Sequence, residues 1–199
     1  GLGDVYKRQI GKRGKIKAQE ILEAAGCTRN SDGFYERDGE EIGFVISVMS
    51  GEQDRIDIAQ AAAQQLRETG INCTVEIPAQ MDWGGQMACL IGWGSPFDAD
   101  DHTYKVFGTD KGANYSSYSN EKVDEYLSLA RQSDDPEVRK EYYGKFQEEL
   151  AEDPAYAFIC YIDANYVADS GIQGISKDTV LGHHGVGIFW NIQDWTIEE

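Results

Sequence analysis

A strand–helix–strand pattern in the first half of the chain constrains the fold more than any other feature. The residues Ile42 to Ser50 form an apolar, strand-like run, and Ile71 to Ile77 alternate apolar and polar side chains until Pro78 stops them. Between these runs, Glu52 to Thr69 has helical periodicity that ends at Gly70; its stripe consists of Ile58, Ala62 and Leu66, flanked by Ala59 and Ala63. A strand, a helix and a strand in this order imply a right-handed parallel crossover, so the sequence predicts an α/β fold.

Two shorter elements precede this pattern. The residues Ile16 to Ala25 have apolar side chains at helical spacing, and Gly26 is a natural C-terminal stop. The pair Asp38-Gly39 follows a strand-like piece, Phe34 to Arg37, and Asp-Gly between two such runs is a strong signal for a hairpin turn. We therefore expect a short helix, then a hairpin that leads into a buried strand.

The second half predicts one strand followed by two helices. The apolar run from Met87 to Trp93 is typical of a strand buried on both faces. Asn120 is a suitable N-cap for a helix through Arg131, and Asp135-Pro136 is a typical helix start. The apolar positions of these helices are Val123, Tyr126, Leu127 and Ala130 in the first, and Val138, Tyr142, Phe146 and Leu150 in the second. We expect both helices to pack on the sheet.

The last part of the chain is less regular. The aromatic and branched residues of Ala155 to Ala168 favour one or two strands. The tail from Gly171 to Glu199 contains strand fragments and turns rich in glycine, and it carries Phe189, Trp190 and Trp195. So much aromatic surface indicates that the tail docks on this domain or on another lobe.

Length and charge restrict the class of protein. A chain of 199 residues with 41% hydrophobic content is long enough for one sizeable core, so one domain is the expectation. The formal net charge of -17 disfavours nucleic acid and anionic lipid as partners. We interpret Gly1 to Gln9 as a translated adapter and residues 1–15 as a non-native or disordered leader, which would make the chain a fragment whose native N-terminal part and signal sequence are missing.

The cysteines and histidines give no metal motif. Cys27, Cys73, Cys89 and Cys160 form no CxxC pair, and buried thiols are favoured, although a disulfide remains open. Adjacent residues on a strand point to opposite faces, so the pair His183-His184 indicates a polar loop rather than two ligands of one metal ion. His102 is distant from both in sequence. We expect no cofactor.

Between Gly92 and Asn120 the chain is aromatic, acidic and interrupted by glycine. Asp98, Asp100 and Asp101 favour a solvated acidic loop over a cation site. No serine or cysteine stands in a nucleophile motif, so an enzyme is not expected. The aromatic side chains form either a ligand-binding wall or part of a core, and they are Trp83, Trp93, Phe97, Tyr104 and Tyr115.

Taken together, these segments resemble bacterial extracytoplasmic solute-binding proteins of family 5, the peptide- and nickel-binding components of ABC transporters. The resemblance covers about residues 16–199. Its most specific segments are AQEILEAAG at 18–26, RNSDGFYERDGEEI at 29–42, AQAAAQQLRETGINCTVE at 59–76, GWGSPFDAD at 92–100, NYSSYSNEKVDEYLSLAR at 114–131 and DDPEVRKEYYGKFQEELAEDPAYAF at 134–158.

The resemblance implies a periplasmic-binding-protein type II fold in which two lobes close on a ligand. Residues 16–199 would supply most of the C-terminal lobe, a mixed sheet flanked by helices, and the N-terminal lobe would be absent. In oligopeptide-binding members a Trp matching Trp93 lines the cleft, and an Asp that pairs with the ligand's amino group matches Pro96. Asp98 lies near enough in sequence to replace that Asp. The implied ligand-binding residues are Trp93, Ser95, Phe97, Asp98 and Trp83.

The function implied is capture of an oligopeptide or similar small solute for an ABC importer. The expected partners are the solute and the membrane permease, and the protein would be an extracytoplasmic monomer, attached through a lipid anchor or free. One alternative is a nickel or nickel-chelate binding protein that uses His102, His183 and His184. Two interpretations of a different class also stay open, namely a small α/β hydrolase and a fragment without activity.

Overall fold

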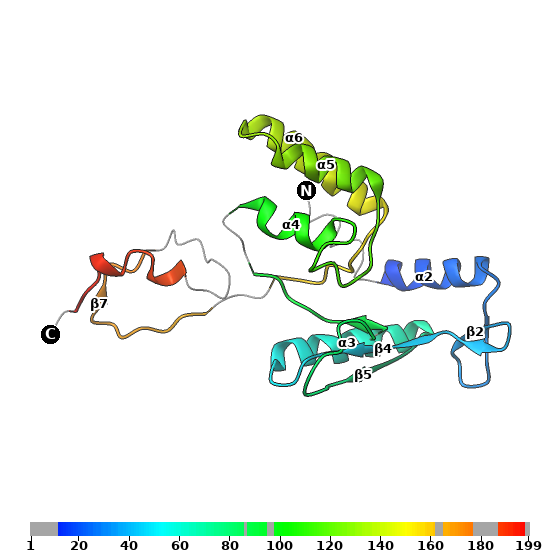
Figure 1. The fold of residues 1–199 in the computed structure, drawn as a ribbon. Coiled ribbons are helices and arrows are strands. Elements are labelled where there is room, and N and C mark those ends of the chain that lie inside the picture. Colours follow the sequence, from blue (N-terminus) through cyan, green and yellow to red (C-terminus); the bar gives the residue numbers. More distant parts are fainter. Residues whose placement is uncertain (1–11, 86, 95–97, 162–164, 177–186, 198–199) are drawn as a thin grey trace. The chain divides into compact units, whose positions relative to one another are not determined.

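The computed structural model describes residues 12–85, 87–94, 98–161, 165–176 and 187–197 (Figure 1). The chain divides into two compact units, Gly1–Gly92 and Trp93–Glu199. The boundary lies within residues 16–199, which the resemblance assigns to one lobe. Each unit is described by itself below.

The first unit begins with helix α2, Lys12–Ala24. This helix confirms the predicted one but starts earlier, inside the predicted leader. Gly26 has φ 84°, and its N–H donates to the Glu23 carbonyl at 3.0 Å while the Cys27 N–H donates to the Leu22 carbonyl at 3.0 Å. This left-handed C-terminal turn is the reason that the helix stops where the sequence places a glycine.

A small antiparallel sheet follows α2, in the order β1-β2-β3. Its strands are β1 Thr28–Arg29, β2 Tyr35–Arg37 and β3 Glu40–Glu41. Asp38 and Gly39 join β2 to β3 with φ values of 55° and 83°. Two successive positive φ values are what a two-residue hairpin of type I′ requires, so the predicted hairpin is confirmed.

The main sheet of the first unit is parallel and has the strand order β5-β4-β6. Strand β4 Gly43–Ser47 leads through helix α3 Gln53–Thr69 to β5 Asn72–Glu76, which confirms the predicted parallel arrangement of these two strands. Strand β6 is only Ala88–Cys89. The expected strand from Met87 to Trp93 is therefore too long, since β4 ends at Ser47, which pairs with Cys89 and accepts the Leu90 N–H at 3.1 Å. It is also not buried on both faces, because Ala88 and Cys89 are half-buried and Met87 is 71% exposed.

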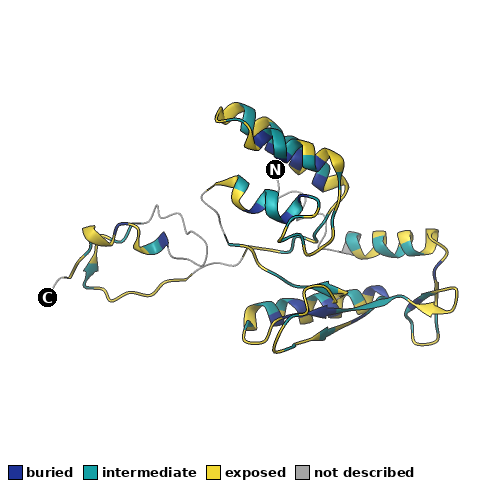
Figure 2. Cartoon of the chain, viewed as in Figure 1, coloured by how far each residue is buried: buried dark blue, intermediate teal, exposed yellow. Residues whose placement is uncertain are grey.

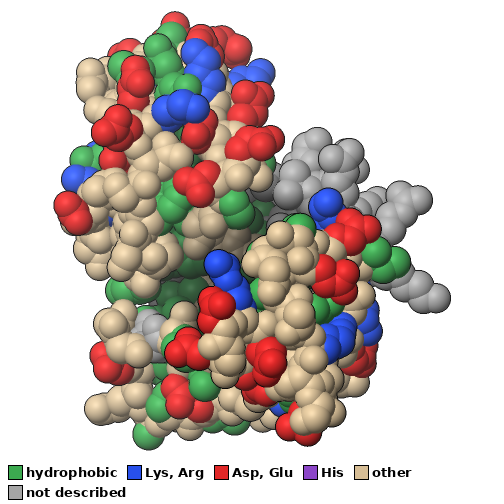
Figure 3. Space-filling model, turned by 90° about the vertical axis from the view of Figure 1, so that its right-hand side faces the viewer, with side chains coloured by type: hydrophobic (Ala, Val, Ile, Leu, Met, Phe, Trp, Pro, Cys, Tyr) green, Lys and Arg blue, Asp and Glu red, His purple; other side chains and the backbone are tan. Residues whose placement is uncertain are grey.

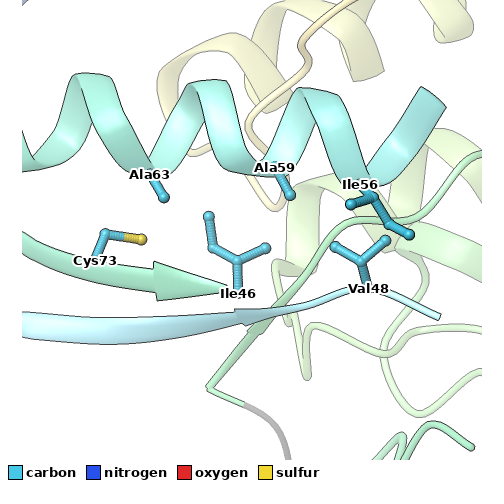
Figure 4. Close-up of a cluster of buried hydrophobic side chains, with 6 residues drawn as sticks. All are labelled: Ile46, Val48, Ile56, Ala59, Ala63 and Cys73. Atoms are coloured by element: carbon cyan, nitrogen blue, oxygen red, sulfur yellow. The ribbon is translucent and has the colours of Figure 1, made fainter. Parts of the chain in front are cut away.

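The core of this unit lies between α3 and the parallel strands (Figure 4). Ile46, Val48 and Cys73 from the sheet side face α3, whose buried residues in this cluster are Ile56, Ala59 and Ala63. The face of α3 that meets the sheet therefore differs from the predicted one. The row of residues that includes Ile56 faces the sheet, whereas Ile58, Ala62 and Leu66 are half-buried. Both rows have helical spacing, so sequence periodicity alone does not choose between them.

The second unit is built on three helices: α4 Ala99–Phe107, α5 Glu121–Arg131 and α6 Pro136–Glu152. Helices α5 and α6 confirm the predicted pair and their caps, since Asn120 Oδ1 accepts the N–H groups of Lys122 and Val123 and Asp135 Oδ1 accepts that of Glu137. Their shared core contains Val123, Leu127, Ala130, Tyr143, Phe146 and Leu150. The expected packing on a sheet is wrong within this unit, because the apolar faces of the two helices cover one another.

Burial follows the same division (Figure 2). The buried positions gather along α3 with its strands and along the helices α4 to α6, whereas α2 has only half-buried and exposed side chains among those described. The strands expected in Ala155 to Ala168 are absent from the described part of that range. Instead, Tyr156 and Phe158 place their rings 5.5 Å and 6.5 Å from that of Phe107. These aromatic residues pack through their side chains and are not part of a hydrogen-bonded strand.

The tail confirms the predicted strand fragments. Strands β7 Ile172–Gln173 and β8 Thr196–Ile197 pair antiparallel, and the short 3-10 helix η2 Ile192–Asp194 precedes β8. Phe189 and Trp195 contact each other with ring centroids 5.7 Å apart. None of the helices in the described ranges is both long and apolar enough to cross a membrane.

Candidate functional site

The carboxyl ends of the parallel strands form the first candidate surface. In open α/β sheets, ligands bind at this edge, where neighbouring connections leave in opposite directions. Here the connection from β4 reaches β5 on one side, and the next connection crosses to β6 on the other. At this edge the buried Ser47 donates a 2.5 Å hydrogen bond from Oγ to the exposed Glu76 carboxylate. The edge therefore presents a fixed carboxylate.

Two further features belong to this surface by their position in the chain. Trp83 lies in the connection between β5 and β6 and is 39% exposed. Gly92 follows β6, and a Cβ atom there would lie 2.8 Å from Arg55 Nη2. Arg55 is paired with Glu52, so the guanidinium is held where a side chain at position 92 would go. A side chain at position 92 would therefore have to displace this guanidinium.

The second candidate surface is an aromatic wall, which we define as Trp93, His102 and Tyr115. The Trp93 and Tyr115 rings stack with centroids 6.1 Å apart and planes at 10°. The His102 ring is tilted beneath Trp93, at a centroid distance of 5.4 Å, and its residue is only 9% exposed. Trp93 and Tyr115 keep 37% and 36% of their surface exposed. Flat rings supported from below and open to solvent suit contact with a ligand.

Helix α4 sets the position of His102, and its first turn is acidic. Asp98 caps the helix by accepting the Asp100 N–H at 2.8 Å. Arg139 Nη2 donates to both Asp98 oxygens, at 2.6 and 2.8 Å. The Asp100 N–H and then Arg139 hold the pKa of Asp98 below its ordinary value, against the opposing effect of desolvation. Asp98 is therefore an ionised, hydrogen-bonded cap.

Asp100 and Asp101 also pair with basic groups. Asp100 lies 3.1 Å from Arg131 Nε, and Asp101 lies 3.0 Å from Lys105 Nζ. The expectation of a solvated acidic loop is wrong only for the loop: the Asp98 and Asp101 side chains are 60% and 54% exposed, but they stand at a helix N-terminus, where the helix dipole favours negative charge. The sequence signal that could have found this helix is Asp98 as a cap, followed by His102 and Val106 at four-residue spacing. The structure buries both His102 and Val106.

Tyr104 does not join the aromatic wall. Its ring lies 3.8 Å from the Arg131 guanidinium and 4.8 Å from Lys111 Nζ. The hydrogen bond and charge of Lys111, with a smaller contribution from Arg131, lower the pKa of Tyr104. The ring also packs against the core of the helices, so for this residue the core interpretation holds.

The five sequence-predicted site residues fall into three groups. Trp93 and Asp98 are in the second unit, Trp83 is in the first, and Ser95 and Phe97 lie outside the described residues, as does Pro96. Sequence reasoning did not identify His102 as the support of Trp93, nor Arg131 and Arg139 as partners of the acidic turn. Arginines on α5 and α6 reach α4 only through tertiary packing, which has no short-range sequence signal.

Among the described residues, no group of three or more His, Cys, Asp and Glu side chains is placed to hold a metal ion, and His183 and His184 lie outside those residues. All four cysteines are described and are free thiols, with Cys27 and Cys73 buried. On the visible face of the molecule, Asp and Glu side chains are widely spread, with Lys and Arg among them (Figure 3).

A shallow groove of about 790 Å³ in the first unit is a separate feature. It runs along α3 and β5, and its lining includes Phe34, Gln60, Arg67 and Thr74. It contains none of the sequence-predicted site residues and does not lie at the carboxyl ends of the strands. We therefore do not treat it as the candidate site.

Comparison with known proteins identifies the family. Residues 6–115 match the family described as bacterial extracellular solute-binding proteins, family 5 Middle. Protein XP55 of Streptomyces lividans is 33% identical over 179 residues, which are 86% of this chain and 33% of XP55. The oligopeptide-binding protein AppA of Bacillus subtilis is 26% identical over 194 residues, or 90% of this chain and 34% of AppA.

Solved structures agree. The crystal structure of NikZ from Campylobacter jejuni in complex with Ni(L-His) matches with a TM-score of 0.79 and 36% identity, covering 92% of this chain and 38% of NikZ. The AppA structure in complex with a nonapeptide gives a TM-score of 0.72 at 24% identity, covering 92% of this chain and 37% of AppA. The predicted α/β fold of the periplasmic-binding-protein type is confirmed. The chain spans about a third of the length of the curated relatives it matches, and it belongs to the bacterial extracellular solute-binding proteins of family 5.

Proposed function

We propose that the protein captures an oligopeptide or a similar small solute outside the cytoplasm and delivers it to the permease of an ABC importer. Family 5 proteins are extracytoplasmic binding proteins of such importers, and members bind peptides or nickel complexes. The solute, the permease and attachment by a lipid anchor are our proposals for this protein. Capture would need no covalent chemistry, since closure around the solute is driven by binding energy.

The observation that carries the proposal is the stacked, half-exposed pair of Trp93 and Tyr115 supported by the buried His102. A single exposed aromatic is ordinary, but two stacked, nearly parallel rings supported by a buried imidazole are a preformed contact surface. We propose that Trp93 contacts the solute, together with Ser95, Phe97 and Trp83. A peptide suits such a wall because its backbone and side chains pack on flat rings.

The direct experiment is isothermal titration of the protein expressed from its complete coding sequence. The titrants are defined pools of peptides of two to nine residues. We expect saturable heat from at least one pool, with a binding stoichiometry of about one, and we expect Tyr115→Ala to weaken it by about tenfold or more. Absence of heat with every pool, from protein shown to be folded, would contradict the peptide proposal.

A second candidate is a nickel complex of an amino acid. The NikZ structure, which contains Ni(L-His), has 36% identity to this chain against 24% for the AppA structure. Imidazole nitrogens suit nickel, and His183 and His184 are the histidines available besides the buried His102. Equilibrium dialysis with nickel, with and without L-histidine, separates the two candidates when repeated on His183→Ala, His184→Ala and the double variant. Nickel retention that these variants abolish, without peptide binding, would favour this candidate.

The hydrolase interpretation has less support. Among the described residues, Asp98 is paired with Arg139, and the His102 ring lies tilted against that of Trp93, so both side chains have structural contacts. The family relatives are binding proteins rather than enzymes.

A further inference from the structure

We propose that Asp98 and Arg139 are positioning residues for the aromatic wall, and that Asp98 does not bind the amino group of the solute. The inference rests on the proposed function and deepens it, because it assigns a role to a carboxylate that the resemblance offered as a ligand contact. It concerns the second unit alone. We name the four residues Asp98, Asp100, Arg131 and Arg139 the α4 clamp.

The α4 clamp joins three helices at one helix end. Asp98 and Asp100 stand at the N-terminus of α4, Arg131 is the last residue of α5, and Arg139 lies in the first turns of α6. Each arginine crosses from its own helix to a carboxylate on α4. Arg139 uses one nitrogen, Nη2, for both Asp98 oxygens, and charge-assisted hydrogen bonds of this kind are short and strong. The clamp therefore restricts rotation of α4.

Both arginines of the clamp also lie against aromatic rings. The Arg131 guanidinium lies 3.8 Å from the centre of the Tyr104 ring, and that of Arg139 lies 5.5 Å from the ring of the buried Tyr143. The Arg139 side chain is only 24% exposed. An exposed ion pair contributes little to stability when two long side chains must be ordered to form it. Here the aromatic rings already orient the two arginine side chains.

Helix α4 connects the clamp to the aromatic wall. His102 lies one helical turn after Asp98 on α4, and its side chain is 11% exposed beneath Trp93. Because residues four apart lie on the same side of a helix, a change in the orientation of the first turn of α4 moves His102. The Trp93 ring rests on His102, so it moves with that residue.

The hydrogen-bonding capacity of Asp98 is largely used. Its two oxygens accept two bonds from Arg139, and Oδ1 also accepts the Asp100 N–H. The Asp98 side chain is 60% exposed, and an ammonium group that approached it would compete with a guanidinium already in contact. Asp98 thus serves α4, and the discrimination of a free amine requires another group.

The test uses Asp98→Asn, which keeps the cap because Asn accepts the same N–H, and Arg139→Gln, which removes the guanidinium. Their double variant completes the cycle. The matched control is Glu141→Gln, which breaks the 2.7 Å pair with Lys145 on α6 without touching α4. Arg139→Lys keeps the charge and serves as the conservative variant. Circular dichroism confirms that each protein is folded.

The first readout needs no solute. In protein labelled with 5-fluorotryptophan, the ¹⁹F resonance of Trp93 is assigned with Trp93→Phe. We expect Asp98→Asn, Arg139→Gln and the double variant to shift it similarly, Arg139→Lys to shift it less, and Glu141→Gln to leave it in place. If Asp98→Asn and Arg139→Gln both leave it in place, the positioning role is overturned.

The second readout separates positioning from capture of an ammonium group. A bound peptide is titrated with a free and with an acetylated amino terminus. We expect both single variants to weaken both forms equally, by about threefold to tenfold, and the double variant to be no worse than either. Loss of the free-amine peptide alone in Asp98→Asn, with Arg139→Gln unaffected, would overturn the inference. If the wild-type protein binds neither form, the proposed function fails, and the fluorine resonance still decides the positioning role.

Discussion

At the scale of single residues, short carboxylate and amide side chains cap the N-termini of helices α4, α5 and α6. Asp98, Asn120 and Asp135 each accept backbone N–H groups that would otherwise lack a partner in the first turn. At the other end of α3, Gly70 adopts φ 106° and ends the helix. Individual residues therefore fix where these elements begin and end.

The cap of α6 gives a direct prediction. Asp135→Ala removes the 2.9 Å bond to the Glu137 N–H and should reduce the free energy of unfolding by about 1 kcal/mol. Asp135→Asn keeps an acceptor and should cost only a few tenths of that amount by the same reasoning. Urea unfolding followed by circular dichroism measures both. Equal losses in the two variants would mean that charge, rather than capping, is responsible.

Asp98 gives a prediction about pH. Its pKa is lower in the folded protein, first because of the Asp100 N–H and then because of Arg139. The resulting stabilisation is complete above the ordinary pKa of about 3.9 and is lost as the pH falls through the lower folded value. The difference in unfolding free energy between wild type and Asp98→Asn should thus be constant from about pH 7 to 5 and shrink below about pH 4. Urea titrations across this range check it, and a difference that grows on acidification would contradict it.

At the scale of elements, the pair α5 and α6 forms a core that depends on a few residues. Leu127 is 0% exposed among Val123, Phe146 and their neighbours. Leu127→Ala should lower the free energy of unfolding by about 2–5 kcal/mol, because it leaves a cavity. The control is Glu125→Ala on the exposed face of α5, expected to change stability by less than about 0.5 kcal/mol. Denaturant unfolding distinguishes them, and similar losses would show that Leu127 is not in a packed core.

The elements that can be predicted from sequence are those with local signals. The hairpin at Asp38-Gly39, the caps Asn120 and Asp135 and the stop at Gly70 each act within a few residues, so the sequence is enough to place them. The face of α3 that meets the sheet, the short β6 and the missing strands after Ala155 are not predictable in this way. These three features depend on which other segment an apolar run contacts in the tertiary structure, and short-range sequence patterns do not encode that contact.

Part of the candidate site can likewise be predicted from the sequence, and part cannot. The resemblance and the aromatic surroundings of Trp93 predict its role, and the stack with Tyr115 gives it a physical setting. The sequence does not predict helix α4, because three aspartates in four residues are typical of a charged loop, although Asp98 is a good cap. The two arginines that hold these acids are 31 and 41 residues away in sequence from Asp100 and Asp98. Charge complementarity over such separations becomes visible only in the fold.

At the scale of the whole molecule, the chain has two compact units and about a third of the length of its curated relatives. The carboxyl edge of the parallel sheet and the aromatic wall are surfaces of different units. Trp83 belongs to the first of these surfaces and Trp93 to the second.

The most direct test of the central claim is calorimetric titration of the complete protein with its best peptide or nickel–histidine titrant, repeated on Trp93→Ala. Tyr161→Ala, which truncates an aromatic that is 81% exposed and outside the wall, is the control. The account predicts saturable binding that Trp93→Ala weakens by about tenfold or more while Tyr161→Ala retains it. Wild-type affinity in Trp93→Ala, or no binding of either titrant by the folded wild-type protein, would contradict it.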